Sequence, residues 1–261
     1  FDELSISENI LRGVYAYGFE KPSMIQGKSI PKIISGGDII AQAQSGTGKT
    51  GAFTIGSMCR IDDSVKETQV LILVPTRELA EQVYKVVKEL SSYTEITCMK
   101  VIGGTNVTMC RDELTKCPHV VVGTPGRVLD MISRRYLYTS GIRTLIFDEA
   151  DEILSYGFKD CIYEIVQTMG KDTQICLFSA TMPDEILELT DKFMKSPEKV
   201  LVKKEELTLE GIQQFYVNTK HSDWKYDVIV DLYDIINVGQ CIIYINSKNR
   251  IVDIYNKLLE D

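Results

Sequence analysis

Short apolar runs recur along the chain and have apolar residues on both faces, without the polar alternation of a half-exposed strand. They read DIIAQA, VLILV, CMKVI, VVVG, TLIF, ICLFS and CIIYI. Amphipathic segments such as ELAEQVYKVVKELSSY separate them, and this combination is typical of a parallel sheet covered by helices. We therefore predict an α/β fold with helices on both faces of a parallel sheet.

A charged segment, VKKEELTLEGIQQ at positions 202–214, interrupts the apolar rhythm and indicates a linker. We predict a first domain at residues 1–203, an interdomain linker at 204–211 and an incomplete second domain at 212–261. For this last part we expect a strand at FYVNT, a helix over 223–236, a strand at CIIYIN and a final helix. About 50 residues are too few for a second α/β domain of ordinary size.

The balance of charge is acidic, with 37 Asp and Glu against 29 Lys and Arg and a net charge of −8. Any contact with nucleic acid must then be local, because bulk electrostatics would oppose it. No apolar run approaches the roughly 18 residues of a membrane span, and Phe1 opens an acidic stretch instead of a signal peptide. We expect a soluble monomer in the cytoplasm, or in the nucleus, without a membrane partner.

The segment AQAQSGTGKT at 41–50 contains GTGKT, although Ala43 stands where the general phosphate-loop pattern has glycine. We expect a turn at Gln44–Gly48 after a buried strand and a helix from Lys49, so that backbone N–H groups face one spot. Lys49 would reach the β and γ phosphates, and Thr50 would bind Mg²⁺. An ordinary glycine turn into a helix is the alternative. The candidate ligands of the nucleotide phosphates are Ser45, Gly46, Thr47, Gly48, Lys49 and Thr50.

The segment TLIFDEAD at 144–151 ends a buried strand with two carboxylates, at the sheet edge where ligands of open α/β sheets bind. Asp148 would hold Mg²⁺, partly through water, and Glu149 would orient or deprotonate an attacking water. Taken alone, the acids could simply favour a helix dipole. Beside GTGKT they predict a catalytic set of Lys49, Asp148 and Glu149 that acts on ATP.

Six motifs occur in the order in which DEAD-box RNA helicases have them: AQAQSGTGKT, PTRELA, GG, TPGR, DEAD and SAT. The chain is therefore similar to that family, which also tolerates alanine at the position of Ala43. The resemblance implies a RecA-like domain, the start of a second one, and an RNA-stimulated ATPase that clamps and locally unwinds RNA with ATP and Mg²⁺. The segments IGGTNV and VKKEELTLEGI resemble the members that act in translation initiation, which implies initiation scaffold proteins as partners.

The resemblance also assigns the adenine to the segment GFEKPSMIQ. A glutamine amide can donate to N7 and accept from N6 of adenine, which makes Gln26 the expected base-reading residue. Phe19 would stack on the base, with Phe1 as the upstream aromatic residue of the same motif. A surface glutamine and a core phenylalanine are the ordinary alternatives for these two residues.

The RNA contacts implied by the family follow apolar strands, where loops and helix N-termini can bind phosphates. They fall on Thr76, Arg77, Gly104, Thr124, Gly126 and Arg127, with Asn246 and Ser247 in the second part. Contacts to backbone and 2′-OH groups imply little sequence preference. By the same resemblance, Ser179 and Thr181 bind Asp151 and couple the nucleotide state to RNA binding. Read alone, TPGR could be only a helix start with proline at its first position.

The 261 residues contain no segment like HRIGRxGR, which supplies the family's arginine fingers. We expect residues outside this chain to provide it, and this chain to bind nucleotide but turn it over poorly. Two alternatives to an initiation helicase remain. One is an ATP-gated RNA clamp of the exon-junction type with little turnover. The other is a RecA-like DNA motor or small-molecule kinase, which would share GTGKT without PTRELA and TPGR.

Overall fold

A computed structural model describes residues 1–155, 157–201, 213, 215–237 and 239–260. Contacts divide the chain into two compact units, Phe1–Thr208 and Leu209–Asp261. The linker expected at 204–211 lies outside the described residues, so the boundaries of 1–203 and 212–261 stay predictions.

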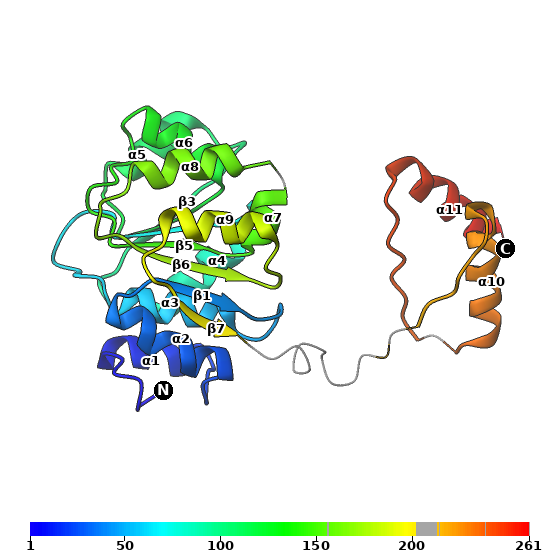
Figure 1. The fold of residues 1–261 in the computed structure, drawn as a ribbon, viewed down its shortest axis with the longest axis horizontal. Helices are drawn as coiled ribbons and strands as arrows, with labels where there is room; N and C mark the ends of the chain where they lie inside the picture. Colours follow the sequence, from blue (N-terminus) through cyan, green and yellow to red (C-terminus); the bar gives the residue numbers. More distant parts are fainter. Residues whose placement is uncertain (156, 202–212, 214, 238, 261) are drawn as a thin grey trace. The chain divides into compact units, whose positions relative to one another are not determined.

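Figure 1 shows the sheet of the first unit between its helices. It has seven strands in the order β3-β4-β2-β5-β6-β1-β7. Every neighbouring pair is parallel. The strands are β1 Ile39–Gln42, β2 Val70–Leu73, β3 Cys98–Val101, β4 Val120–Gly123, β5 Thr144–Phe147, β6 Gln174–Ser179 and β7 Glu198–Leu201. The predicted parallel sheet is confirmed. We missed the edge strand β7, because Glu198 and Lys199 break the apolar run that marks the other strands.

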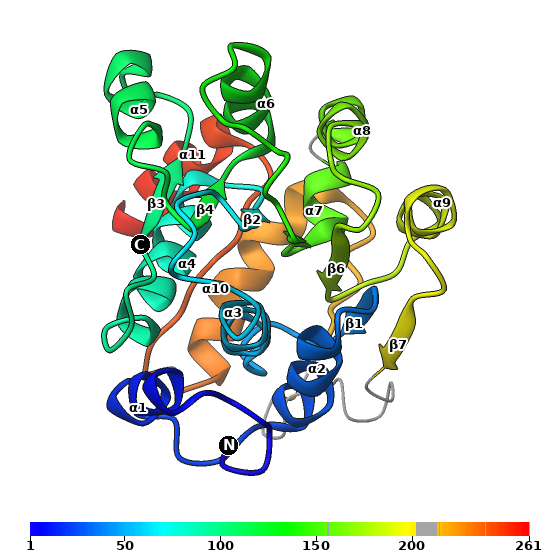
Figure 2. The same ribbon diagram turned by 90° about the vertical axis from the view of Figure 1, so that its left-hand side faces the viewer.

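Helices cover both faces of this sheet, as Figure 2 shows end-on. One face packs against α1 Glu8–Ala16, α2 Met24–Ser35, α3 Lys49–Met58 and α4 Arg77–Leu90. The other packs against α5 Val107–Leu114, α6 Pro125–Ser133, α7 Ala150–Ser155, α8 Lys159–Gln167 and α9 Asp184–Phe193. Each face therefore closes its own apolar core. Of the helices described, none has both the length and the apolar character needed to cross a membrane.

The carboxyl ends of the strands are level along one edge of the sheet. Gln42 pairs with Ser179, and Leu73 pairs with both Gly123 and Phe147. Because all strands run the same way, the segments that follow them emerge side by side. GTGKT, PTRELA, GG, TPGR, DEAD and SAT all lie at or just beyond the strand ends at this edge, whereas the segment GFEKPSMIQ lies before β1, after α1 and into the first turn of α2.

The second unit contains a 3₁₀ turn η2 at Ser222–Trp224 and the helices α10 Lys225–Ile235 and α11 Lys248–Glu260. Both helices were predicted, but the strands expected at FYVNT and CIIYI were wrong, because residues 215–219 and 241–245 form no strand. A strand needs neighbours for its backbone N–H and C=O groups, and no other strand lies in the described part of this unit.

Candidate functional site

The phosphate loop has the backbone that its glycines allow. Gly46 and Gly48 have φ values of +82° and +97°, a left-handed conformation that a side chain would strain. Ala43 is fully buried, and its φ is not positive. Its N–H donates to the Ser179 carbonyl at 3.1 Å, so it continues the strand. Alanine at this position therefore costs the loop nothing, because the tight part of the turn begins later.

Lys49 is the first residue of α3, and it is only 5% exposed. Its Nζ donates to both carboxylate oxygens of Glu149, at 2.9 Å and 3.0 Å. The N–H groups of the first turn of α3 have no partner within the helix. A fixed cation and free N–H groups thus meet at one point, which is the combination that binds phosphate oxygens.

Asp148 and Glu149 follow β5 directly. Asp148 is 2% exposed, and burial, together with the charge of Glu149, raises its pKa to about 7. Its Oδ1 accepts from the Glu149 N–H at 3.1 Å. Glu149 has a φ of +50°, a conformation that costs roughly 1–3 kcal/mol for a residue with a side chain. The structure thus brings the three predicted catalytic residues together; their roles stay predictions.

The oxygen donors near this spot suit a cation that arrives with a nucleotide. Among the residues that the structure describes, no group of three or more His, Cys, Asp or Glu side chains could hold a metal ion by itself. The predicted ligands are the Asp148 carboxylate and the Thr50 hydroxyl. Mg²⁺ usually takes one or two such ligands and fills its other positions with water and phosphate oxygens. The donor set therefore fits Mg²⁺ bound to ATP or ADP.

Gln26 fastens the expected adenine segment to the phosphate loop. It is 3% exposed, and its Oε1 accepts from the Ser23 N–H at 2.9 Å in a capping box at the start of α2. Its Nε2 donates to the Gly48 carbonyl at 3.3 Å. Both ends of the amide are therefore engaged by backbone groups. Reading of adenine by Gln26 stays a prediction, and a bound base would have to share or replace these bonds.

Phe19 packs against the first turn of α3. Its ring stacks on Phe1, with the centroids 6.1 Å apart. A Cβ on Gly51 would lie 3.0 Å from the Phe19 ring and 2.8 Å from Gln26 Nε2. Glycine at this position is therefore what lets Phe19 and Gln26 approach α3. Stacking of Phe19 on a base stays a prediction.

Asp151 bonds to the segment that follows β6. Thr181 donates to its Oδ2 from the backbone N–H at 3.1 Å and from Oγ1 at 2.6 Å. The Asp151 N–H donates to Ser179 Oγ at 3.3 Å. Partial burial opposes ionisation, but the hydrogen bonds from Thr181 and Ser179 prevail and hold the pKa of Asp151 below its ordinary value. The hydrogen bonds expected for the coupling residues are present.

An open groove of about 470 Å³ lies beyond the ends of β2, β3 and β4. Five predicted RNA-binding residues line it: Thr76, Arg77, Thr124, Gly126 and Arg127. The sixth, Gly104, has a φ of +83°, and a Cβ there would lie 2.6 Å from Arg77 Nη1. Six residues scattered over the sequence therefore meet around one groove.

Sequence reasoning missed other residues that line this groove, among them Glu78, Gly103 and Phe158. Glu78 and Gly103 belong to the quoted motifs PTRELA and GG and could have been included. Phe158 caps α8 and reaches the groove through the fold, so no local pattern marks it.

Two helix N-termini open into the groove. Thr76 caps α4 and accepts from the Leu79 N–H at 3.2 Å, while Thr124 precedes α6 with Pro125 at its first position. Arg127 Nη1 donates to the Thr105 carbonyl at 3.0 Å, which fixes one guanidinium beside the groove. Helix N-termini and arginine side chains are common phosphate ligands in nucleic-acid complexes.

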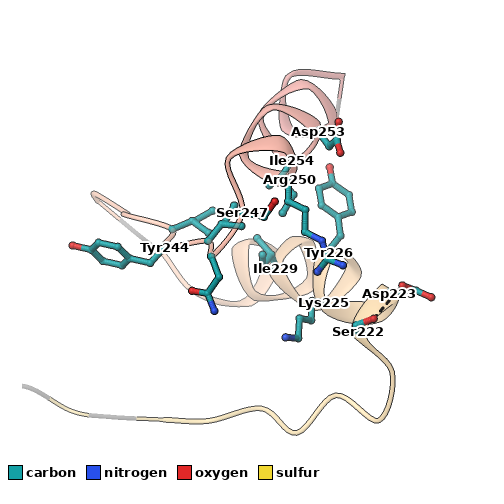
Figure 3. A pocket seen from close by; sticks show the side chains of 13 residues that line it. Ser222, Asp223, Lys225, Tyr226, Ile229, Tyr244, Ser247, Arg250, Asp253 and Ile254 are labelled. Carbon is teal, nitrogen blue, oxygen red and sulfur yellow. Dashed lines mark hydrogen bonds between the residues drawn. The ribbon is translucent and has the colours of Figure 1, made fainter. Parts of the chain in front are cut away.

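Asn246 and Ser247 lie in the second unit, which is described by its own contacts. They line a separate pocket of about 460 Å³, together with Lys225, Tyr226 and Arg250 (Figure 3). The lining contains two cations, Lys225 and Arg250, but also two acids, Asp223 and Asp253, so cations do not predominate in it. The RNA contacts of Asn246 and Ser247 stay a prediction.

Comparisons with known proteins bear on this site. Over 258 residues the chain is 53% identical to the ATP-dependent RNA helicase eIF4A of Mycosarcoma maydis, which matches 99% of this chain and 63% of that protein. Among solved structures, S. cerevisiae Dbp5 bound to RNA and ADP BeF3 has a TM-score of 0.85 and 33% identity, over 100% of this chain and 66% of that one. The chain thus spans slightly less than two thirds of the length of these relatives, and the RecA-like α/β fold is confirmed.

The family itself is shown by a direct match. Residues 23–189 match the family described as DEAD/DEAH box helicase. This segment begins at the cap of α2 and ends within α9, so it contains the phosphate loop, the acids after β5 and the groove. With more than half of its length matched, the chain belongs to the DEAD/DEAH box helicase family, and it is similar to eIF4A within it.

Proposed function

We propose that the chain is the nucleotide-binding part of an ATP-dependent RNA helicase, an RNA-stimulated ATPase that clamps and locally unwinds RNA in translation initiation. The order of strands along the sheet carries this proposal. The groove loops follow β3, β4 and β2, while the phosphate loop and the segment after β6 lie on the other side of β5. Asp148, Glu149 and Asp151 follow β5, between the two halves. A nucleotide and an RNA strand would therefore share one edge of one rigid sheet.

Nucleotide binding requires an exchange of partners at Lys49. In the structure its ammonium group is neutralised by Glu149. The β and γ phosphates of ATP would take over the ammonium group, because they carry more negative charge than one carboxylate. Glu149 would then be free to accept a proton from, or orient, the attacking water. Mg²⁺, held through Thr50 and Asp148, would neutralise charge on the phosphates.

The Asp151 bonds provide a route from nucleotide to groove. Asp151 is joined through Thr181 and Ser179 to the segment beside the phosphate loop. The same short stretch carries Glu149, whose bond to Lys49 would be broken when phosphates take its place. A shift in this stretch would reach α7 and, through it, the α8 end that carries Phe158. The nucleotide site and the groove would then be linked energetically through the segment that follows β5.

RNA recognition in the groove would depend on backbone contacts. The N-termini of α4 and α6, with Arg77 and Arg127, suit phosphates and carry no base information. Glu78 lines the same groove, and its carboxylate could accept a hydrogen bond from a 2′-OH, which DNA lacks. We infer a preference for RNA over DNA with little preference for sequence. The RNA that is bound to the similar Dbp5 structure supports this assignment.

The finer parts of the proposal concern turnover, partners and place. The 261 residues lack an HRIGRxGR segment, so nucleotide should bind while hydrolysis stays slow. An ATP-gated clamp of an exon-junction type complex is the alternative; the 53% identity to eIF4A favours the initiation helicase. We also propose that the protein is a monomer, that its partners are scaffold proteins of translation initiation, and that it is located in the cytoplasm or the nucleus.

The test uses this chain joined to a complete second domain, which we call the joined protein. We expect single-stranded RNA to stimulate ATP hydrolysis by the joined protein, and we expect the joined protein to separate the strands of a short RNA duplex. DNA of the same sequence should neither stimulate hydrolysis nor be unwound. In Thr181→Val, RNA and ATP should still bind, but RNA stimulation should fall at least tenfold, because the Oγ1 bond to Asp151 is lost. Equal stimulation by DNA, or an unaffected Thr181→Val protein, would contradict the proposal. Tight RNA binding without turnover, with or without a scaffold partner, would favour the clamp.

A further inference from the structure

A hollow of about 190 Å³ lies at the sheet edge opposite the phosphate loop. It is lined at the start of β1 by Asp38 and at the start of β6 by Ile175, whereas the loops described above follow the ends of the strands. Val166 near the end of α8, Met169 just beyond it and Phe193 at the end of α9 complete an apolar lining. Figure 2 shows α8 and α9 on the same face of the sheet. Neither a nucleotide at Lys49 nor RNA in the groove would reach this hollow.

Three exposed lysines line the same hollow: Lys171, Lys192 and Lys195. Among the described residues, none of them forms an ion pair with an acidic side chain. Lys192 Nζ donates to the Tyr163 hydroxyl at 3.3 Å, and Lys195 Nζ bonds to the Lys171 carbonyl. Both partners are neutral, and among the described residues no acidic side chain lies within ion-pair distance of the three ammonium groups, although Glu188, the partner of Lys159, lies near enough to Lys192 to interact with its charge. The hollow thus has a positive rim in a chain whose net charge is −8.

The one acidic residue of this lining does not neutralise them. Asp38 is 8% exposed, and its Oδ1 accepts from the Ile175 N–H at 2.7 Å. Its Oδ2 accepts from the backbone N–H of Lys195 at 2.6 Å. The carboxylate is therefore engaged in holding the backbone that forms the hollow. Asp172 and Asp191, beside the lysines in sequence, form no ion pair with them in the described residues.

The size and chemistry of the hollow select its occupant. Small-molecule sites usually measure roughly 300–1,000 Å³, so this hollow holds about one large side chain. An apolar floor offers nothing to a polyphosphate or a nucleic-acid backbone, while a rim of cations favours carboxylates. We propose that this hollow docks an acidic peptide segment of a partner protein, with one apolar side chain in the hollow and flanking carboxylates on the three lysines.

The test uses the 261-residue chain and fluorescent peptides of defined sequence. One peptide has a leucine flanked by aspartates and glutamates, a second has serine in place of leucine, and a third has lysines in place of the acids. We expect the leucine peptide with acidic flanks to bind most tightly, and we expect its affinity to fall as the salt concentration is raised. The triple charge reversal Lys171→Glu, Lys192→Glu and Lys195→Glu should lower the affinity for this peptide at least tenfold.

A matched triple variant controls for net charge. Lys66→Glu, Lys85→Glu and Lys88→Glu change three other exposed lysines that also form no ion pair in the described residues. This control should bind the leucine peptide within twofold of the unaltered chain. Unchanged ADP affinity in both triple variants would show that each is folded.

A separate variant tests the hollow itself. Gly170 lines it, its φ is not positive, and an added Cβ would lie at an ordinary 3.5 Å from Thr173 Oγ1. Gly170→Leu should therefore fold and block the leucine side chain, with a loss of at least fivefold. The proposal fails if no acidic peptide binds, if serine replaces leucine without loss, or if both triple variants lose equally. It also fails if the triple charge reversal lowers the affinity for single-stranded RNA and leaves the affinity for the peptide unchanged.

Discussion

Lys49 and Glu149 are a hundred residues apart in sequence, yet Lys49 Nζ lies 2.9 Å from Oε1 and 3.0 Å from Oε2 of Glu149. The lysine is 5% and the glutamate 19% exposed, so the pair is shielded from water. The two groups that are predicted to act separately on a nucleotide are thus bound to one another. Under the proposed exchange of partners, nucleotide binding would also release the Glu149 carboxylate.

Replacement of either member of this pair should have opposite effects on binding. In Glu149→Gln the carboxylate no longer competes for Lys49, so we expect ADP to bind about two- to tenfold more tightly, or roughly 0.4–1.4 kcal/mol. Lys49→Ala removes the strong point charge for the phosphates and should abolish measurable binding. Calorimetric titration measures both. Weaker binding by Glu149→Gln, or unchanged affinity in Lys49→Ala, would contradict the proposed exchange.

Gln26→Ala should weaken ATP and ADP more than GDP, because its amide matches the edge groups of adenine. The variant also loses the bonds to Ser23 and Gly48, which lowers stability. Ser23→Ala is the matched control, since it removes half of the capping box and costs about 1 kcal/mol without touching the amide. Its base selectivity should be unchanged. An equal loss for adenine and guanine nucleotides in Gln26→Ala would remove the assignment.

Gly104→Ala should damage RNA binding while nucleotide binding is kept. The residue has a φ of +83°, and the added Cβ would meet Arg77 Nη1 at 2.6 Å, so both the loop and the arginine must move. We expect the affinity of the joined protein for single-stranded RNA to fall at least tenfold. Gly103→Ala, with its Cβ 3.2 Å from Arg77 and no positive φ, should lose less than threefold. Similar losses in the two variants would show that the groove does not depend on this geometry.

The buried Asp148 should make the nucleotide-free protein less stable as pH rises. Its pKa is raised from 3.8 to about 7, so between these values the unfolded chain loses a proton that the folded chain keeps. The contribution of Asp148 to the free energy of unfolding therefore falls over this range and is lowest above pH 7. Asp148→Asn, in EDTA, should gain about 2 kcal/mol relative to the unaltered chain between pH 5 and pH 8. Denaturant unfolding at a series of pH values measures this difference. If the free energies of unfolding of the unaltered chain and of Asp148→Asn change with pH in the same way, the prediction is contradicted.

Local patterns in the sequence predicted most of the framework. The strands at 70–73 and 144–147 are continuous apolar runs that end in functional residues, and Gly48 marks the start of α3. Such features are readable because their cause is local: burial on two faces, or a backbone that only glycine adopts easily. The motif order then identified the family.

The rest of the fold and site depends on contacts between distant segments. The edge strand at 198–201 has a charged surface, and residues 241–245 form no strand although they are apolar, because neighbours decide whether such segments pair. The engagement of Gln26 by Gly48, and of Lys49 by Glu149, joins positions 22 and 100 residues apart. No pattern within one segment predicts these pairings.

Turnover by the 261-residue chain tests the central claim most directly. The predicted contacts to adenine, phosphates and Mg²⁺ lie on this chain, whereas the 261 residues contain no HRIGRxGR segment to supply the arginine fingers that would stabilise the γ-phosphate in the transition state. We expect ADP to bind with about −7 to −8 kcal/mol, and ATP hydrolysis to stay near background with or without single-stranded RNA. An added second domain should restore RNA-stimulated hydrolysis, and the same domain with its arginines replaced should not. RNA stimulation of tenfold or more by this chain alone would contradict the account.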